Sequence, residues 1–98
     1  MFRTASDNTN RIESDEGFSV EILGRGGLCY REPPREMLVD SEFLALGGRF
    51  DVVVYSDSVR RWKPPYAEDT IDGGKHGQIL DNIRRALEFR DLRIDLDP

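Results

Sequence analysis

One stretch of this chain repeats its apolar residues with the period of a helix, whereas the segments around it alternate with the period of a strand. Between residues 76 and 90 the helical stripe is made of His76, Ile79, Leu80, Ile83, Leu87 and Arg90, with Ala86 beside them. This i, i+3, i+4, i+7 spacing predicts an amphipathic helix. We expect it to start near Gly74 or Lys75, with Thr70 or Asp72 as its cap, and to end near Arg90.

The predicted strands are FSVEIL (18–23), LCYRE (28–32), REMLVD (35–40), RFDVVVYS (49–56) and LRIDLD (92–97), with the short apolar FLAL (43–46) between the third and fourth. The run at 49–56 is apolar on both faces in its middle, which predicts a central strand. GRGG (24–27) is predicted to be a turn. The pattern predicts an α+β fold: an antiparallel or mixed sheet of about five strands, with one long helix packed on one face and a final strand after it.

The first 16 residues differ in character from the rest of the chain. They are polar and acidic and carry almost no large apolar side chains. Such a segment buries too little surface to offset the entropy of ordering. We therefore expect a flexible leader over residues 1–16 and a single α+β domain over residues 17–98, close to the usual domain size of about 100–150 residues.

The charge balance and the single cysteine limit the partners and the compartment. The chain has 19 acidic and 14 basic side chains and a net charge of −5. This balance argues against general nucleic-acid binding and suits a basic protein partner. Cys29 has no second cysteine to pair with, which fits a reducing compartment. The N-terminus lacks an apolar signal segment, and no run approaches the ~20 apolar residues of a membrane helix, so we expect a soluble cytoplasmic protein.

Groups suited to catalysis or ligand binding are few. His76 is the single histidine, and its place on the helical stripe favours a structural role over general-base or zinc chemistry. GRGG lacks the spacing and the lysine of a nucleotide-binding loop. Asp69 and Asp72 would repel an anion from the glycines of IDGGK (71–75). We predict no catalytic residue, no metal and no cofactor.

The segment SDSVRRWKPPY (56–66) follows the predicted central strand and is basic, aromatic and rigid. Ser56, Asp57 or Ser58 could cap a single helical turn over residues 59–62. Pro64 and Pro65 then stiffen the exit from that turn. Val59 and Trp62 fall on one side of it, which favours burial of the indole against the long helix.

Three strings of the sequence together resemble the core of the immunity protein 74 family. They are YSDSVRRWKPPY (55–66), IDGG (71–74) and ILDNIRRALEFRDLRIDLD (79–97). The most specific part is Arg61-Trp62-x-Pro64-Pro65 together with the helix, and the Tyr30–Glu32 hairpin also fits. The resemblance spans roughly residues 18–96, in keeping with one whole domain. It departs from the family at Asp91, where a glycine is expected to close the helix, and at the glycines of the helix entrance.

The resemblance implies an immunity protein of a bacterial polymorphic toxin system. Such a protein is a cytoplasmic antitoxin that binds and blocks a cognate toxin made by the same cell, and no catalytic residue carries over. An acidic surface would speed the capture of a basic toxin. The candidate partner-binding residues are Arg60, Arg61, Lys63, Tyr66, Glu68 and Asp69, and the structural turn consists of Trp62, Pro64 and Pro65.

Three other interpretations remain open from the sequence. A nucleic-acid- or protein-binding module would use the Arg60-Arg61-Trp62-Lys63 turn, since Trp, Tyr and Arg dominate interface hot spots. A small hydrolase would need His76 or a carboxylate pair in a deep pocket. A homodimer would use a long, bare edge of the strand at 50–55.

Overall fold

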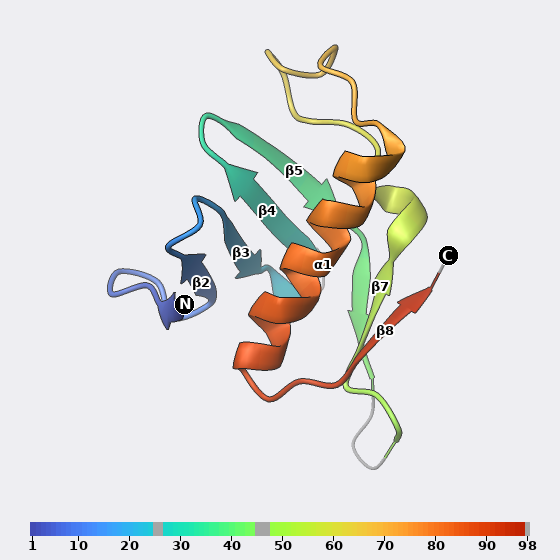
Figure 1. Cartoon of the computed structure of the whole chain (residues 1–98). Helices are drawn as coiled ribbons and strands as arrows, with labels where there is room; N and C mark the ends of the chain where they lie inside the picture. The colour runs from blue at the N-terminus through green and yellow to red at the C-terminus, as the bar shows by residue number, and fades with distance from the viewer. Residues whose placement is uncertain (25–26, 45–47, 98) are drawn as a thin grey trace.

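The computed structural model describes residues 1–24, 27–44 and 48–97, which form two β-sheets and one long helix (Figure 1). The antiparallel five-stranded sheet consists, in order, of β1 (Phe2–Thr4), β2 (Arg11–Ser14), β3 (Ser19–Ile22), β4 (Leu28–Glu32) and β5 (Arg35–Val39). The second sheet has β7 (Val52–Tyr55) in the centre, antiparallel to β6 (Ser41–Phe43) and parallel to β8 (Ile94–Asp97). Helix α1 (Gly73–Phe89) precedes β8.

The predicted α+β class is confirmed, with a five-stranded antiparallel sheet, one long helix and a final strand after it. The strand at 49–56 was expected to be central, and β7 is central in the smaller sheet. The two sheets meet where the chain passes from β5 to β6. Asp40 is the single residue between β5 and β6, so the chain leaves one sheet and joins the other at this residue. The Tyr55 amide of β7 donates to the Asp40 carbonyl oxygen at 3.0 Å.

The expected flexible leader is corrected by the structure, because residues 1–16 contain β1 and β2. Ile12 is fully buried and lies opposite Val20 of β3. The Phe2 ring lies 5.8 Å from the Phe18 ring, centroid to centroid. β1 pairs with β2 inside the segment, but β2 pairs with β3, and the apolar cover of Phe2 and Ile12 comes from later residues. The composition of residues 1–16 alone does not contain that cover, and it therefore suggested disorder.

Helix α1 begins one residue before the earlier of the two expected starts. Asp72 is its N-cap, one of the two caps predicted, and its carboxylate accepts from the Lys75 amide at 2.7 Å. At the other end Asp91 adopts φ +60°, the left-handed conformation for which a glycine was expected. The C-terminal turn therefore forms at the predicted place with aspartate in the glycine position.

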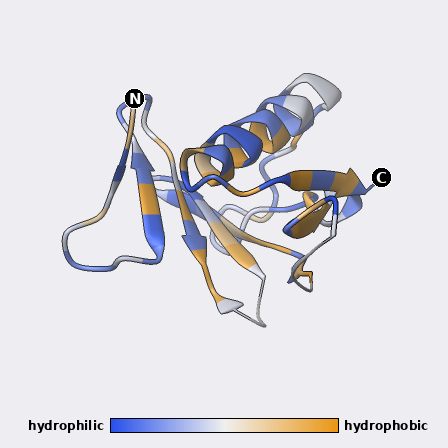
Figure 2. Cartoon of the chain, turned by 90° about the horizontal axis from the view of Figure 1, so that it is seen from below, coloured by the Kyte–Doolittle hydropathy of each residue, from blue (hydrophilic) through white to orange (hydrophobic). Residues whose placement is uncertain are grey.

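The helix covers both sheets with its apolar stripe (Figure 1). Hydrophobic residues of α1 face the strands in Figure 2, and Ile79, Ile83, Ala86 and Leu87 are fully buried. From the smaller sheet, Val52 and Val54 enter the same core. The helix therefore joins the two sheets into one hydrophobic core.

Two predicted loop features fall partly on residues outside the described ranges. Residues 25–26 of GRGG and residues 45–47, which include the end of FLAL, are among them. At the described part of GRGG the Gly27 amide donates to the Gly24 carbonyl oxygen at 3.3 Å. Gly27 has φ +92°, and a Cβ there would lie 2.5 Å from the Val39 carbonyl oxygen. A glycine is therefore required at this position.

Candidate functional site

The segment from Ser56 to Asp72, called here the corner loop, joins β7 to α1 and projects beyond the sheets (Figure 1). Its helical turn is a 3₁₀ turn at Ser56–Ser58 and not at the predicted residues 59–62. The Ser58 hydroxyl donates to the Tyr55 carbonyl oxygen at 2.6 Å, which closes this earlier turn. Further along, the Lys63 amide donates to the Glu36 carbonyl oxygen at 2.8 Å, which holds this part of the loop against β5.

Trp62 anchors the corner loop to the hydrophobic core. Its side chain is buried, as predicted, with 3% of its surface exposed. The indole stacks on Tyr30 of β4 with ring centroids 6.2 Å apart, and Val59 is buried beside it in the same core. The aromatic residue of the turn therefore belongs to the core, while the residues around it remain available at the surface.

A polar network beneath the loop joins β4 to the start of α1, and the sequence patterns did not reveal it. The Tyr30 hydroxyl donates to the Glu32 carboxylate and accepts from Asn82 Nδ2 at 2.9 Å. Glu32 also accepts from Lys75 Nζ at 2.7 Å. Burial raises the pKa of Tyr30 well above its ordinary value, so the hydroxyl remains a donor at neutral pH. The one clue in the sequence was a polar residue, Asn82, next to the apolar stripe of the helix.

Four of the six predicted partner-binding residues lie around one hollow. Arg60, Arg61, Glu68 and Asp69 are all exposed. The hollow has a volume of about 630 Å³ and is lined by Arg60, Arg61, Ala67, Glu68, Asp69, Thr70 and Ile71. The arrangement presents both signs of charge around a shallow depression, which suits a polar protein surface better than a small apolar ligand.

The other two predicted residues lie toward β5 instead. Lys63 Nζ is 3.4 Å from a Glu36 carboxylate oxygen. The Tyr66 ring lies under the Arg35 guanidinium, 4.9 Å from centroid to carbon, and Arg35 pairs with Asp69 at 2.7 Å. Lys63 and Tyr66 therefore support the loop from the sheet side, and they do not line the hollow with the arginines.

His76 has the structural role that its place in the sequence predicted. It is half-buried in the first turns of α1, and its Nε2 lies 2.8 Å from the Ser56 carbonyl oxygen. Because a carbonyl oxygen can only accept, Nε2 is the donor in this contact. Within residues 1–24, 27–44 and 48–97, no group of three His, Cys, Asp or Glu side chains is placed to hold a metal ion.

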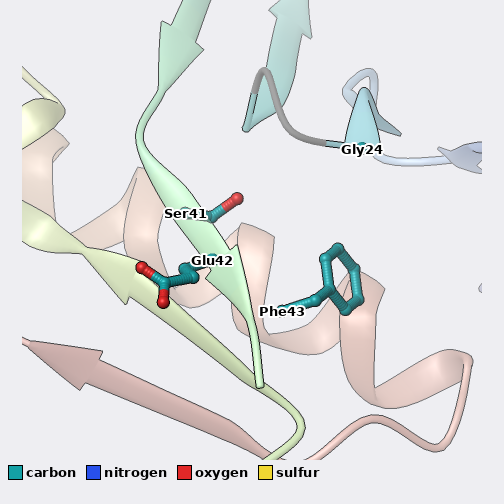
Figure 3. A pocket seen from close by; sticks show the side chains of 4 residues that line it. All are labelled: Gly24, Ser41, Glu42 and Phe43. Carbon is teal, nitrogen blue, oxygen red and sulfur yellow. The ribbon is translucent and has the colours of Figure 1, made fainter. Parts of the chain in front are cut away.

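A second hollow lies beside β6, where the chain leaves the five-stranded sheet (Figure 3). Its volume is about 440 Å³, and its described lining is Gly24, Ser41, Glu42 and Phe43. In Figure 3, Ser41 and Phe43 are turned toward Gly24, whereas Glu42 is turned toward the neighbouring strand. In the described lining the one carboxylate, Glu42, is turned away from Ser41 and is not placed to activate it as a nucleophile.

A family model described as Immunity protein 74 matches residues 19–97, from β3 to β8. No curated protein and no solved structure matches the chain significantly. The matched region includes the corner loop and the whole helix, whereas β1 and β2 lie before it. None of the helices in the described part of the chain has the length and apolar character needed to cross a membrane.

Proposed function

Because this chain belongs to the immunity protein 74 family, we propose that it binds and neutralises a cognate toxin in the bacterial cytoplasm. The observation that carries the proposal is the match of the family model to residues 19–97 of a 98-residue chain. The protein would act without catalysis, by occupying the surface through which the toxin works. Neutralisation then depends on affinity and on a slow off-rate.

The corner loop is the proposed contact surface. Arg60 and Arg61 are exposed, and neither forms an ion pair within the described ranges. Arg60 Nε donates to the Asp57 carbonyl oxygen at 2.6 Å, so the terminal nitrogens of Arg60 and the guanidinium group of Arg61 can bind a partner. The loop is anchored by the stacking of Trp62 on Tyr30 and by the hydrogen bond from Lys63 to Glu36. An anchored loop loses little conformational entropy on binding, which favours affinity. Arginine is also among the residues that dominate interface hot spots.

The structure weakens the nucleic-acid interpretation of the same loop. Trp62 is buried, so its indole is not available to stack on a base. Lys63 is paired with Glu36, which leaves two adjacent arginines as the free cations of the motif. The bare edge at 50–55 that a homodimer would use is not available, because β6 and β8 pair with both edges of β7.

The proposal is tested by capturing tagged protein from a lysate of its source bacterium and identifying the co-purifying proteins by mass spectrometry. A stoichiometric partner with a toxin domain is then expressed with and without this chain. We expect growth arrest from the toxin domain alone and recovery when this chain is present. A partner set with no toxic protein, or arrest that this chain does not relieve, contradicts the proposal.

The contact surface is tested with paired substitutions. Arg60→Ala/Arg61→Ala should raise the Kd for the toxin domain about tenfold or more, because central arginines can each contribute about 2 kcal/mol to binding. Arg3→Ala/Arg49→Ala removes two exposed arginines away from the loop and should leave the Kd within about twofold of wild type. Equal weakening by both pairs would show that only net charge matters.

A further inference from the structure

The three-stranded sheet has one face in the core and one face open to solvent. Val52 and Val54 of β7 are fully buried, whereas Val53 and Tyr55 are half-buried. Ile94 and Leu96 of β8 pack against the core, which turns Asp95 and Asp97 to the other face because side chains alternate along a strand. This open face, called here the acidic face, consists of Asp40, Glu42, Val53, Tyr55, Asp95 and Asp97.

The strand register arranges these side chains in three rows, one along each of the strands β6, β7 and β8. Val53 lies between Glu42 on β6 and Asp95 on β8. In the next position Tyr55 lies opposite Asp97, and its amide donates to the Asp40 carbonyl oxygen. Adjacent strands are about 4.8 Å apart, so two rows of carboxylates run roughly 10 Å apart on either side of an apolar and aromatic strip.

The surroundings of the Tyr55 hydroxyl confirm that the carboxylates share one face. The hydroxyl lies 3.5 Å from a Glu42 carboxylate oxygen, and Figure 3 shows Glu42 turned toward β7. The negative charge of Glu42 raises the pKa of Tyr55 above its ordinary value, and Asp97 adds to this effect. Both outer strands therefore contribute negative charge around the central tyrosine.

The two sheets differ in how their charges are balanced. The strands of the five-stranded sheet carry four arginines and four glutamates, and all eight take part in ion pairs. Some of these pairs cross between strands, as those of Arg31 do with Glu21 at 2.8 Å and with Glu36 at 3.0 Å. The strands of the smaller sheet carry three carboxylates and no lysine or arginine. Across the described ranges, no ion pair reaches Asp40 or any carboxylate of these strands.

We propose that the acidic face docks a lysine- and arginine-rich surface of the toxin, an inference that rests on the proposed function. Lysine and arginine stems can lie over Val53 and Tyr55 while their head groups reach the two carboxylate rows. The face of the Tyr55 ring can also bind a cationic side chain through a cation–π interaction. Alternate residues of a strand are about 7 Å apart, so a basic segment in extended conformation matches the spacing within each row.

The acidic face is continuous with the foot of the corner loop. The Ser56 hydroxyl donates to the Asp97 carbonyl oxygen at 2.8 Å, which joins the end of β8 to the start of the loop. One partner can therefore contact the acidic face and the arginines of the corner loop together. The unpaired carboxylates would also accelerate the encounter with a basic partner, and this effect weakens as salt increases.

The test compares two isosteric pairs of substitutions that change the net charge equally. Asp95→Asn/Asp97→Asn removes the carboxylates of β8. Glu88→Gln/Asp91→Asn removes two exposed carboxylates that lie off both the acidic face and the corner loop. The acidic-face pair loses no described ion pair, and the control loses only the exposed pair between Arg84 and Glu88, while Arg84 keeps Asp81 as a partner. Thermal melts of both variants verify that each remains folded.

The probe is the purified toxin domain that co-purifies with wild-type protein, titrated calorimetrically at low and high salt. We expect Asp95→Asn/Asp97→Asn to raise the Kd about tenfold and to flatten its salt dependence, because two close charge pairs are removed. The control pair should stay within about twofold of wild type. Equal affinities for the two pairs would overturn the docking proposal while leaving the proposed function intact. A wild-type protein that neither binds nor neutralises the domain would refute both.

Discussion

The buried hydroxyl of Tyr30 connects β4 to α1, and Tyr30→Phe removes it without creating a large cavity. The hydroxyl donates to Glu32 and accepts from Asn82 Nδ2 at 2.9 Å. Tyr30 has no exposed surface and Asn82 has 5%, so water has little access to replace the lost partner. The substitution therefore leaves a buried amide donor unsatisfied and removes one donor from a carboxylate.

The size of the effect follows from these contacts. A hydrogen bond to a charged group contributes about 1.5–3 kcal/mol, and a buried group left unpaired costs about 1–3 kcal/mol. Glu32 keeps Lys75 at 2.7 Å, and Asn82 Oδ1 keeps Arg85 at 2.6 Å, so the two penalties are not fully additive. We expect the free energy of unfolding to fall by about 2–3 kcal/mol, which for a domain of this size lowers the Tm by roughly 8–20 °C.

The assay is urea denaturation followed by the fluorescence of Trp62, the single tryptophan, which stacks on Tyr30. Tyr55→Phe is the matched control, because its hydroxyl lies 3.5 Å from an exposed glutamate and should matter by less than about 0.5 kcal/mol. Asn82→Ala, alone and combined with Tyr30→Phe, completes a double-mutant cycle with an expected coupling of about 1 kcal/mol.

Two results would refute this reasoning. One is a Tyr30→Phe protein whose stability lies within about 0.5 kcal/mol of wild type, the level expected for a surface change. The other is strict additivity of the Tyr30 and Asn82 substitutions, which would mean that the two side chains do not interact energetically. Either result would show that the Tyr30–Asn82 network does not stabilise the packing of the helix on the sheet.

Two further predictions concern the N-terminal strands and the charged ladder. Ile12→Ala should lower the free energy of unfolding by about 2–5 kcal/mol because Ile12 is fully buried, whereas a flexible leader would give no change in the urea midpoint. The hydrogen bond from Arg31 holds the pKa of Glu21 below its usual 4.5. The contribution of the Arg31–Glu21 pair to the free energy of unfolding is therefore present above pH 4.5 and is lost as the pH falls through the lowered pKa. Wild type should lose more stability than Glu21→Gln between pH 5 and pH 3. Parallel urea midpoints for the two proteins over that range would contradict the ion pair.

The elements with clear periodicity were predictable because their patterns are local. The stripe from Ile79 to Leu87 identified α1, and alternation identified β3, β4, β5 and β8. The valine run predicted a central strand, and β7 is central because β6 and β8 pair with its two edges, although Val53 and Tyr55 on one of its faces are only half-buried. The N-cap at Asp72 also followed from residue type and position.

The segments that were missed depend on partners distant in the sequence. β1 and β2 are short and polar: β1 pairs with β2, β2 pairs with β3, and Ile12 is buried in a core formed largely by residues later in the chain. The helical turn lies at Ser56–Ser58, where the Ser58 hydroxyl donates to the Tyr55 carbonyl oxygen. Further along, the Lys63 amide bonds to the Glu36 carbonyl oxygen of β5, an interaction that no local pattern contains. At the candidate site, the burial of Trp62 was predicted, but its stacking partner Tyr30 was not.

By itself, the sequence predicted the helix and the longer strands, favoured burial of Trp62, and placed Arg60 and Arg61 at the surface. These properties depend on side-chain period and on the chemistry of neighbouring residues. Only the tertiary structure decided that the strands divide into two sheets and that carboxylates from β6 and β8 share one face. Register and sheet order, which bring Glu42 and Asp95 to either side of Val53, arise from packing between segments far apart in the chain.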